Sequence, residues 1–166
     1  MVVYHGSNVI VEHPRLVCQN RTLDFGYGFY TTTNLSQAIN FANKVADRRE
    51  CGSPHISMYE VPEINDLQLN FQVLIFPEPD GAWLDFVCAN RNGNYHGQSY
   101  DIIFGPVAND TIYRTFIAYE DGILTREETI ARLKIKKLYN QMTFSTEAAL
   151  QQLNYIGELN EKGDFK

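Results

Sequence analysis

Hydrophobic residues recur at helical spacing most clearly between Asn34 and Glu50. Apolar side chains in this stretch would form one face of a helix, at Leu35, Ala38, Ile39, Ala42, Val45 and Ala46. Asn34 is a residue type that caps helix N-termini, and Gly52 follows the expected C-terminus. The pattern therefore predicts a helix over residues 34–50.

The rest of the chain mixes short apolar runs with further helical patterns. Short apolar runs span residues 2–5, 9–11, 56–61, 71–76, 100–104, 141–144 and 154–156, most of which we expect to be strands. Helical patterns span residues 80–91, 110–122, a segment capped by Thr125 with Glu128, and 146–153. Strands and helices do not alternate strictly, so we expect an α+β fold. Because no repeat or linker divides the chain, we expect residues 1–166 to form a single domain.

Composition and charge narrow the function classes. The 166 residues are 44% hydrophobic, which suffices for one sizeable core, and 14 Lys and Arg against 20 Asp and Glu give a net charge of −6. This balance argues against a broad surface for nucleic acid or for an anionic membrane. No apolar run approaches the roughly 20 residues of a membrane span, and no signal peptide is recognisable. We therefore expect a cytoplasmic protein without a membrane partner.

Cysteine and histidine spacing predicts neither disulfides nor a metal site. Cys18, Cys51 and Cys88 form no Cys-x-x-Cys pair, and they are an odd number. The four histidines also lack the spacing of metal ligands. A reducing compartment fits this pattern.

Two segments carry residue types that core packing does not require. One is Tyr4-His5-Gly6-Ser7, and the other runs from Asp24 to Thr33. In the second segment, Gly26 and Gly28 allow backbone conformations closed to other residues and let a flat ligand approach the main chain. Taken alone, the second segment is also what a glycine-rich hairpin with core aromatic residues would contain.

Together, the two segments resemble the first two signatures of the ADP-ribosyltransferase superfamily in its diphtheria-toxin-like branch. His5-Gly6-Ser7 matches a His-Gly-Ser/Thr motif, and residues 26–30 match a Gly-x-Gly-aromatic-Tyr motif that precedes a helix. Over nearly its whole length the chain is also similar to a family of small bacterial ADP-ribosyltransferase-like proteins. The resemblance implies an ADP-ribosyltransferase-like split β-sheet sandwich with flanking helices, and NAD as co-substrate.

The resemblance implies a role for each motif residue. His5 would hydrogen-bond a ribose hydroxyl of NAD, the backbone of Gly6 would hold the nicotinamide carboxamide, and Ser7 would assist. Tyr30 would stack on the nicotinamide ring, so that the His5 and Tyr30 rings face each other across one cleft. Arg21 would contact the pyrophosphate, or is a solvated loop charge. The implied NAD-binding set is His5, Gly6, Ser7, Arg21, Asp24, Gly28, Phe29, Tyr30 and Thr31.

The third superfamily signature is an acidic residue, or a glutamine in some branches, at the start of a late strand. By position it falls on Gln141, which implies the catalytic set His5, Tyr30 and Gln141. Glutamine can hydrogen-bond a ribose hydroxyl but cannot act as a general base at neutral pH, so we expect Gln141 to orient the substrate. Asp101 and Asp110 are the alternatives for an acidic role, although Asp101 begins a strand and Asp110 is suited to cap a helix.

The resemblance implies an NAD-dependent mono-ADP-ribosyltransferase whose macromolecular acceptor the sequence does not identify. It further implies a toxin or phage-defence effector with a neighbouring antitoxin protein as partner. The alternative is a non-catalytic module that binds NAD or ADP-ribose and regulates a partner protein. RNA 2′-phosphotransferase chemistry belongs to the same fold, but the densest basic stretch, residues 132–137, is typical of a solvated helix face.

Overall fold

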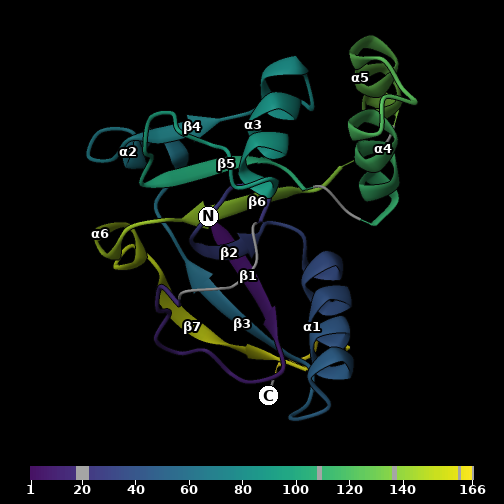
Figure 1. Ribbon diagram of the computed structural model, residues 1–166. Helices are drawn as coiled ribbons and strands as arrows, with labels where there is room; N and C mark the ends of the chain where they lie inside the picture. Colours follow the sequence, from purple (N-terminus) through teal and green to yellow (C-terminus); the bar gives the residue numbers. More distant parts are fainter. Residues whose placement is uncertain (18–22, 108–109, 136–137, 161, 166) are drawn as a thin grey trace.

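The computed structural model describes residues 1–17, 23–107, 110–135, 138–160 and 162–165 (Figure 1). Within these residues the chain is an α+β fold with one mixed sheet of seven strands and with six helices. The strands are β1 (Val2–Ser7), β2 (Phe29–Thr32), β3 (His55–Glu60), β4 (Val73–Ile75), β5 (Ile102–Pro106), β6 (Asn140–Phe144) and β7 (Asn154–Leu159). The helices are α1 (Leu35–Arg49), α2 (Ile64–Leu67), α3 (Gly81–Arg91), α4 (Asp110–Glu120), α5 (Arg126–Ile135) and α6 (Glu147–Leu150).

The sheet has the strand order β4-β5-β6-β2-β1-β3-β7. Neighbouring strands are antiparallel except β4 and β5, which are parallel. Strands β1 and β3 share six residue pairs, and β2 and β6 share four. At the centre, however, β1 and β2 share the single pair Tyr4–Thr32. The sheet therefore consists of two well-paired halves, β4-β5-β6-β2 and β1-β3-β7, that are joined at one point.

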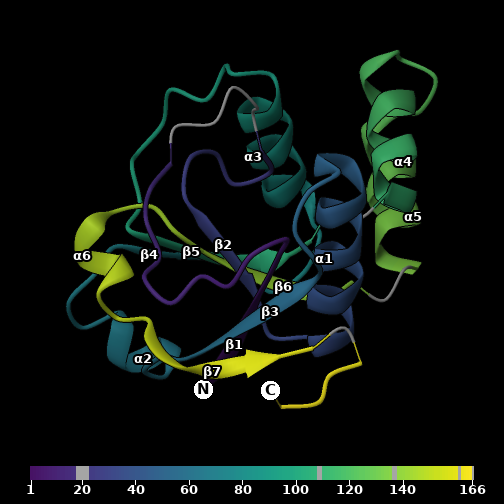
Figure 2. The same cartoon turned by 90° about the horizontal axis from the view of Figure 1, so that it is seen from below.

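Side chains alternate between the two faces of the sheet, and each face has its own core. One face packs against α6 and α2, in a cluster that includes Val3, Phe29, Tyr59, Leu67, Met142, Phe144 and Leu150. The opposite face packs against α3, α4 and α5 through Phe25, Trp83, Ile103, Phe116 and Leu133, and against α1 through Ala38, Ala42 and Met58. Figure 2 shows α1, α3, α4 and α5 on the same side of the sheet.

Helix N-termini agree with the sequence-based predictions. The Asn34 side chain accepts a hydrogen bond of 2.9 Å from the N–H three residues on, and α1 follows. Thr125 and Glu128 form the predicted capping box at the start of α5, with bonds of 3.2 and 2.8 Å between side chains and main-chain N–H groups. At its C-terminus α1 ends where Glu50 adopts a left-handed conformation, with φ of 52°.

Several boundaries differ from the prediction for identifiable reasons. The strand expected from residue 100 begins at Ile102, because Asp101 is held by the main chain of Gln72 through two hydrogen bonds of 2.9 Å. The helix expected over residues 146–153 ends at Leu150. After it, main-chain hydrogen bonds join residues three positions apart and form turns. Strand β4 is shorter than expected and β7 longer, the 9–11 segment forms no strand, and the single turn α2 was not predicted.

The α4–α5 hairpin lies at one edge of the molecule, where the two helices run side by side (Figure 1). Arg126 of α5 donates a hydrogen bond of 2.8 Å to Asp85 of α3, which links the hairpin to the body. Asp85 is therefore the partner of a residue on another helix. Among the described helices, none is both long and apolar enough to cross a lipid bilayer.

Candidate functional site

The two signature segments meet at the centre of the sheet, where β1 lies beside β2. Met1 and Val61 exchange main-chain hydrogen bonds of 2.7 and 2.9 Å. In a regular strand, odd-numbered residues of β1 therefore direct their main-chain groups at β3, and even-numbered residues direct theirs at β2. The pair Tyr4–Thr32 follows this rule.

The His5 imidazole takes the place of the next pair in this ladder. Antiparallel pairing would continue from Tyr4–Thr32 to Gly6–Tyr30, but the Tyr30 carbonyl lies 2.7 Å from His5 Nδ1 instead. The main-chain N–H and C=O of Gly6 are thus directed toward β2 without a ladder partner on that strand. We call this interruption the β1–β2 opening, bordered by His5, Gly6 and Tyr30.

The contacts of His5 define its hydrogen-bonding state. A carbonyl oxygen only accepts hydrogen bonds, so Nδ1 donates to Tyr30 and Nε2 of the neutral ring is an acceptor. Burial lowers the pKa of His5 below the ordinary histidine value, and the bond to the Tyr30 carbonyl only partly opposes this effect. The ring also stacks on Phe29, with centroids 4.3 Å apart and an interplanar angle of 28°. The imidazole is therefore fixed in orientation and favoured in its neutral form.

Glycine is required at two positions of the signature segments. A Cβ atom on Gly6 would lie 2.2 Å from the Ala38 carbonyl oxygen, so glycine lets α1 approach the main chain of β1. A Cβ atom on Gly28 would lie 2.5 Å from Thr143 Cγ2 and 2.8 Å from the Phe144 carbonyl oxygen. Both glycines bring the backbone of the signature segments close to neighbouring elements.

Tyr30 holds the glycine segment in place. Its hydroxyl donates to the Gly26 carbonyl at 2.7 Å and accepts from the Phe25 N–H at 3.0 Å. Burial, reinforced by the nearby Asp24 carboxylate, raises the pKa of Tyr30, so the phenol stays protonated. Because His5 stacks on Phe29, the residue before Tyr30, strand alternation puts the two signature rings on opposite faces of the sheet. The expectation that these rings face each other is therefore wrong, although His5 touches the Tyr30 main chain.

Gln141 lies on β6 opposite Thr32, and strand alternation puts it on the same face as Tyr30. It is 7% exposed, and its Nε2 has no hydrogen-bond partner within the described residues. The hydroxyl of Ser145, four positions further on, is also buried without a hydrogen-bond partner among the described residues, whereas the Thr143 hydroxyl lies beside the Tyr30 side chain. Since buried polar groups are nearly always hydrogen-bonded, we expect the unpartnered groups of Gln141 and Ser145 to bind water or another polar group.

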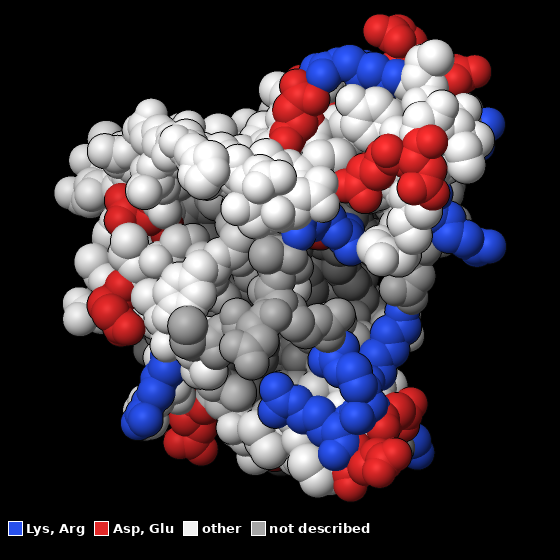
Figure 3. Space-filling view, in the orientation of Figure 1, with Lys and Arg blue, Asp and Glu red and all other residues white. Residues whose placement is uncertain are grey.

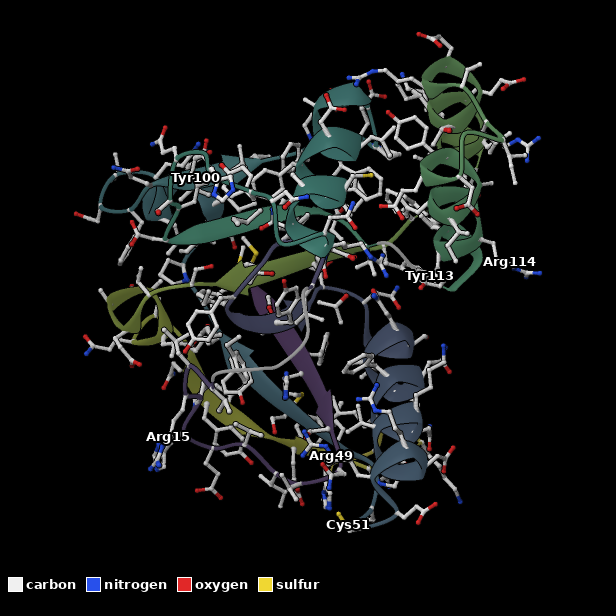
Figure 4. All side chains as sticks on the ribbon, in the orientation of Figure 1. Arg15, Arg49, Cys51, Tyr100, Tyr113 and Arg114 are labelled. Atoms are coloured by element: carbon white, nitrogen blue, oxygen red, sulfur yellow. The ribbon has the colours of Figure 1, made fainter. Side chains whose placement is uncertain are left out.

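Asp24 is bound to a residue that the sequence motifs do not include. Arg91, at the end of α3, donates from Nη1 to Asp24 Oδ1 at 3.0 Å. The same guanidinium lies over the Tyr113 ring of α4, 4.8 Å from its centroid, and Figure 4 labels Tyr113 on this helix. Arg91 thus joins the glycine segment to α3 and α4. No sequence signal identifies it, because the three partners are distant along the chain.

The other predicted site residues have the following positions. Thr31 is buried, and its hydroxyl donates to the Met142 carbonyl at 2.9 Å. Ser7 is half-buried and pairs with His55 on β3. Asp101 accepts hydrogen bonds from the Gln72 N–H and the Thr146 hydroxyl, which supports its structural interpretation. Arg21 and the side chain of Asp110 lie outside the described residues.

Within the described ranges, no group of three or more His, Cys, Asp or Glu residues is arranged to hold a metal ion. A family model described as a protein of unknown function, DUF3990, matches residues 1–155. No curated protein and no solved structure matches the chain.

Proposed function

The chain belongs to the DUF3990 family of unknown function, and we propose that it is an NAD-dependent mono-ADP-ribosyltransferase that binds NAD at the β1–β2 opening. The observation that carries this proposal is the His5 imidazole that interrupts the ladder and leaves the Gly6 main chain unpaired toward β2. The sheet in two halves joined at Tyr4 and Thr32 also supports an ADP-ribosyltransferase-like split sandwich.

The unpaired main chain of Gly6 suits the carboxamide of nicotinamide. A carboxamide carries one donor and one acceptor side by side, as a neighbouring strand does. The carboxamide would therefore form with the Gly6 main chain the two hydrogen bonds that Tyr30 would form in a regular ladder. Glycine at this position also keeps α1 close, since Ala38 of α1 leaves no room for a side chain. The ring would lie between β1 and β2, within reach of both faces of the sheet.

The state of His5 suits a ribose hydroxyl. Nδ1 donates to Tyr30, so the remaining ring nitrogen, Nε2, accepts from a hydroxyl donor. Because burial favours the neutral imidazole, this acceptor persists at neutral pH. His5 would thus orient the NAD ribose without exchanging a proton with it.

Gln141 would support the transition state from the other face. Cleavage of the nicotinamide–ribose bond develops positive charge on the ribose, and enzymes assist by fixing the hydroxyls and stacking the leaving ring. The unpartnered Nε2 of Gln141 can donate to a ribose oxygen, while its Oε1 can accept from a hydroxyl. An amide does not remove the proton of an acceptor nucleophile, so we expect slow transfer, an acceptor that is already activated, or a base supplied from elsewhere.

Nicotinamide release tests this proposal directly. The purified chain, incubated with NAD and whole-cell lysate, is expected to release nicotinamide, and His5→Ala and Gln141→Ala are expected to lower the rate about 100-fold or more. His13→Ala and Gln151→Ala, at exposed positions, are matched controls that should retain the parent rate. Thermal unfolding verifies that each variant is folded.

Two results would contradict the proposal. One is that the parent chain neither binds NAD nor releases nicotinamide with lysate present. The other is that folded His5→Ala and Gln141→Ala proteins keep the parent rate. With labelled NAD, separate protease and nuclease treatments of the product would identify the acceptor class.

A non-catalytic NAD-binding module is the second candidate, favoured by the amide of Gln141 where most branches of the superfamily carry an acid. It predicts calorimetric binding of NAD without nicotinamide release over hours. Loss of binding in His5→Ala would then locate the ligand at the β1–β2 opening. A toxin or defence role with an antitoxin partner would rest on the transferase activity.

A further inference from the structure

A serine, a histidine and a carboxylate lie in line at the beginning of β3, outside the β1–β2 opening. Ser53 Oγ is 2.9 Å from His55 Nε2, and His55 Nδ1 is 3.4 Å from Glu158 Oε2 on β7. The two ring nitrogens thus face different partners, one a hydroxyl and the other a carboxylate. Nucleophilic catalysis uses the same order of groups: a general base contacts the nucleophile, and a carboxylate orients that base.

The loop that carries Ser53 is held by the main chain and by a buried asparagine. Ser53 N–H donates to the Asn8 carbonyl at 3.2 Å, and Asn8 Nδ2 donates to the Cys51 carbonyl at 3.0 Å. Gly52, between these residues, has φ of 75°, and a Cβ atom there would lie 2.2 Å from the Asn8 carbonyl oxygen. Pro54 further restricts the backbone of Ser53 to an extended conformation. The backbone before and after Ser53 is therefore held in place, whereas the residue itself is exposed to solvent.

The carboxylate of Glu158 lies where it would favour one tautomer of His55. Glu158 Oε2 is buried and has no hydrogen bond within the described residues, and its side chain is 17% exposed. A buried carboxylate favours a donor beside it, so we expect the neutral imidazole to carry its proton on Nδ1. The lone pair of Nε2 then faces the Ser53 hydroxyl. His55, whose side chain is 15% exposed, is shielded more than the serine it contacts.

We propose that Ser53 is a nucleophile that reacts with acyl esters, with His55 as its general base and Glu158 as a positioning residue. Ser53 Oγ attacks the ester carbonyl carbon while its proton passes to His55 Nε2. The bond from carbon to the alcohol oxygen breaks, and His55 returns the proton to that leaving alcohol. Water then attacks the acyl-serine with His55 again as base, which releases the carboxylic acid and restores the hydroxyl.

The Arg49 guanidinium is connected to the loop that carries Ser53 through Asn8. Arg49 Nη1 lies 3.4 Å from Asn8 Oδ1, and Asn8 also binds the Cys51 carbonyl. Figure 4 shows Arg49 and Cys51 at the same end of the molecule, and Figure 3 shows both Lys and Arg and Asp and Glu side chains near this end of α1. The residues and the chemistry of this proposed esterase site differ from those of the β1–β2 opening. The esterase proposal does not depend on NAD binding.

A fluorophosphonate probe tests the nucleophile on the full chain. The serine oxygen forms a bond to phosphorus, fluoride leaves, and the hydroxyl proton passes to His55. Mass spectrometry is expected to find one adduct, on Ser53, and none in Ser53→Ala. Ser36→Ala, at an exposed serine of α1, is the matched control and should label at the parent rate. Absence of an adduct on Ser53, or equal labelling of Ser36, would overturn the proposal.

Two further measurements separate the roles of His55 and Glu158 from support of the fold. His55→Ala is expected to slow labelling about 100-fold or more, and added imidazole should restore part of the rate. On the unchanged chain, nitrogen NMR of neutral His55 is expected to find the proton on Nδ1, and Glu158→Gln should reduce that preference. A parent chain with the proton on Nε2 would overturn the proposal even if His55→Ala did not fold.

Discussion

One added methyl group at Gly6 tests how closely α1 approaches the signature strand. In Gly6→Ala the new Cβ would meet main-chain atoms of α1, at 2.2 Å from the Ala38 oxygen and 2.9 Å from the Ala42 nitrogen. Because backbone atoms cannot rotate away, we expect the free energy of unfolding to fall by about 1–3 kcal/mol in urea titrations. In the control Gly81→Ala, the close atom belongs to the flexible end of Arg126, and a change below about 0.5 kcal/mol is expected. A Gly6→Ala protein as stable as the parent would contradict the packing of α1 on β1.

His5 links stability to pH with a definite sign. Its pKa is lower in the folded chain than in the unfolded chain, so in mild acid the unfolded state binds more protons. The free energy of unfolding should therefore decrease as the pH falls below about 6.5, the ordinary histidine value. His5→Gln should reduce this slope, and His13→Gln, at an exposed position, should leave it unchanged. Equal slopes for the parent and His5→Gln in urea titrations between pH 5 and 7 would refute a buried neutral imidazole.

At the residue scale, only part of the candidate site could be predicted from sequence. His5, Gly6 and Gly28 stand out because a histidine at the end of an apolar run and closely spaced glycines break local patterns. The structural use of Asp101 depends on Gln72, which lies in another segment, and the tether of the Tyr30 hydroxyl depends on how the chain folds back within its own segment. Sequence resemblance also could not reveal that the Tyr30 and His5 rings lie on opposite faces of the sheet. That arrangement depends on which face of β2 the Tyr30 side chain occupies.

At the scale of elements, Arg91 connects three segments that the sheet does not join. Its bond to Asp24 and its contact with Tyr113 predict that Arg91→Gln loosens both the glycine segment and α4. We expect amide hydrogens of residues 23–28 to exchange about tenfold faster, as suits the loss of a partly exposed charged hydrogen bond. Arg114→Gln is the matched control, because Arg114 of α4 points away from the body in Figure 4. Unchanged exchange in Arg91→Gln would show that Asp24 does not anchor the segment.

Helices with strong local signals were predicted most accurately. The cap at Asn34 and the capping box at Thr125 are short-range features, so the sequence around them suffices. Strand limits were less accurate, because a strand ends where its partner ends. The start of β5, for example, depends on Gln72, which lies 29 positions before Asp101. The four-residue α2 is too short to display a helical period.

At the scale of the whole molecule, the α+β class could be predicted, but the arrangement of the sheet could not. Each half of the sheet contains strands from both ends of the chain: β1 and β7 belong to one half, and β2 and β6 to the other. The hydrophobic pattern indicates that a segment is a strand, but it does not show which strands lie beside it in the sheet. The single-pair joint between β1 and β2 therefore required the structure.

The hydrogen bond from Thr31 to Met142 joins residues 111 positions apart, and the β2–β6 pairing surrounds it. Contacts of such sequence separation form slowly, because a long loop must close before they contribute. Gln141 meets Thr32 only when this closure is complete. A chain that has formed its helices but has not closed this loop would lack the β2–β6 pairing that borders the proposed NAD site. If the chain binds NAD as proposed, NAD affinity should therefore appear during refolding only after this loop has closed.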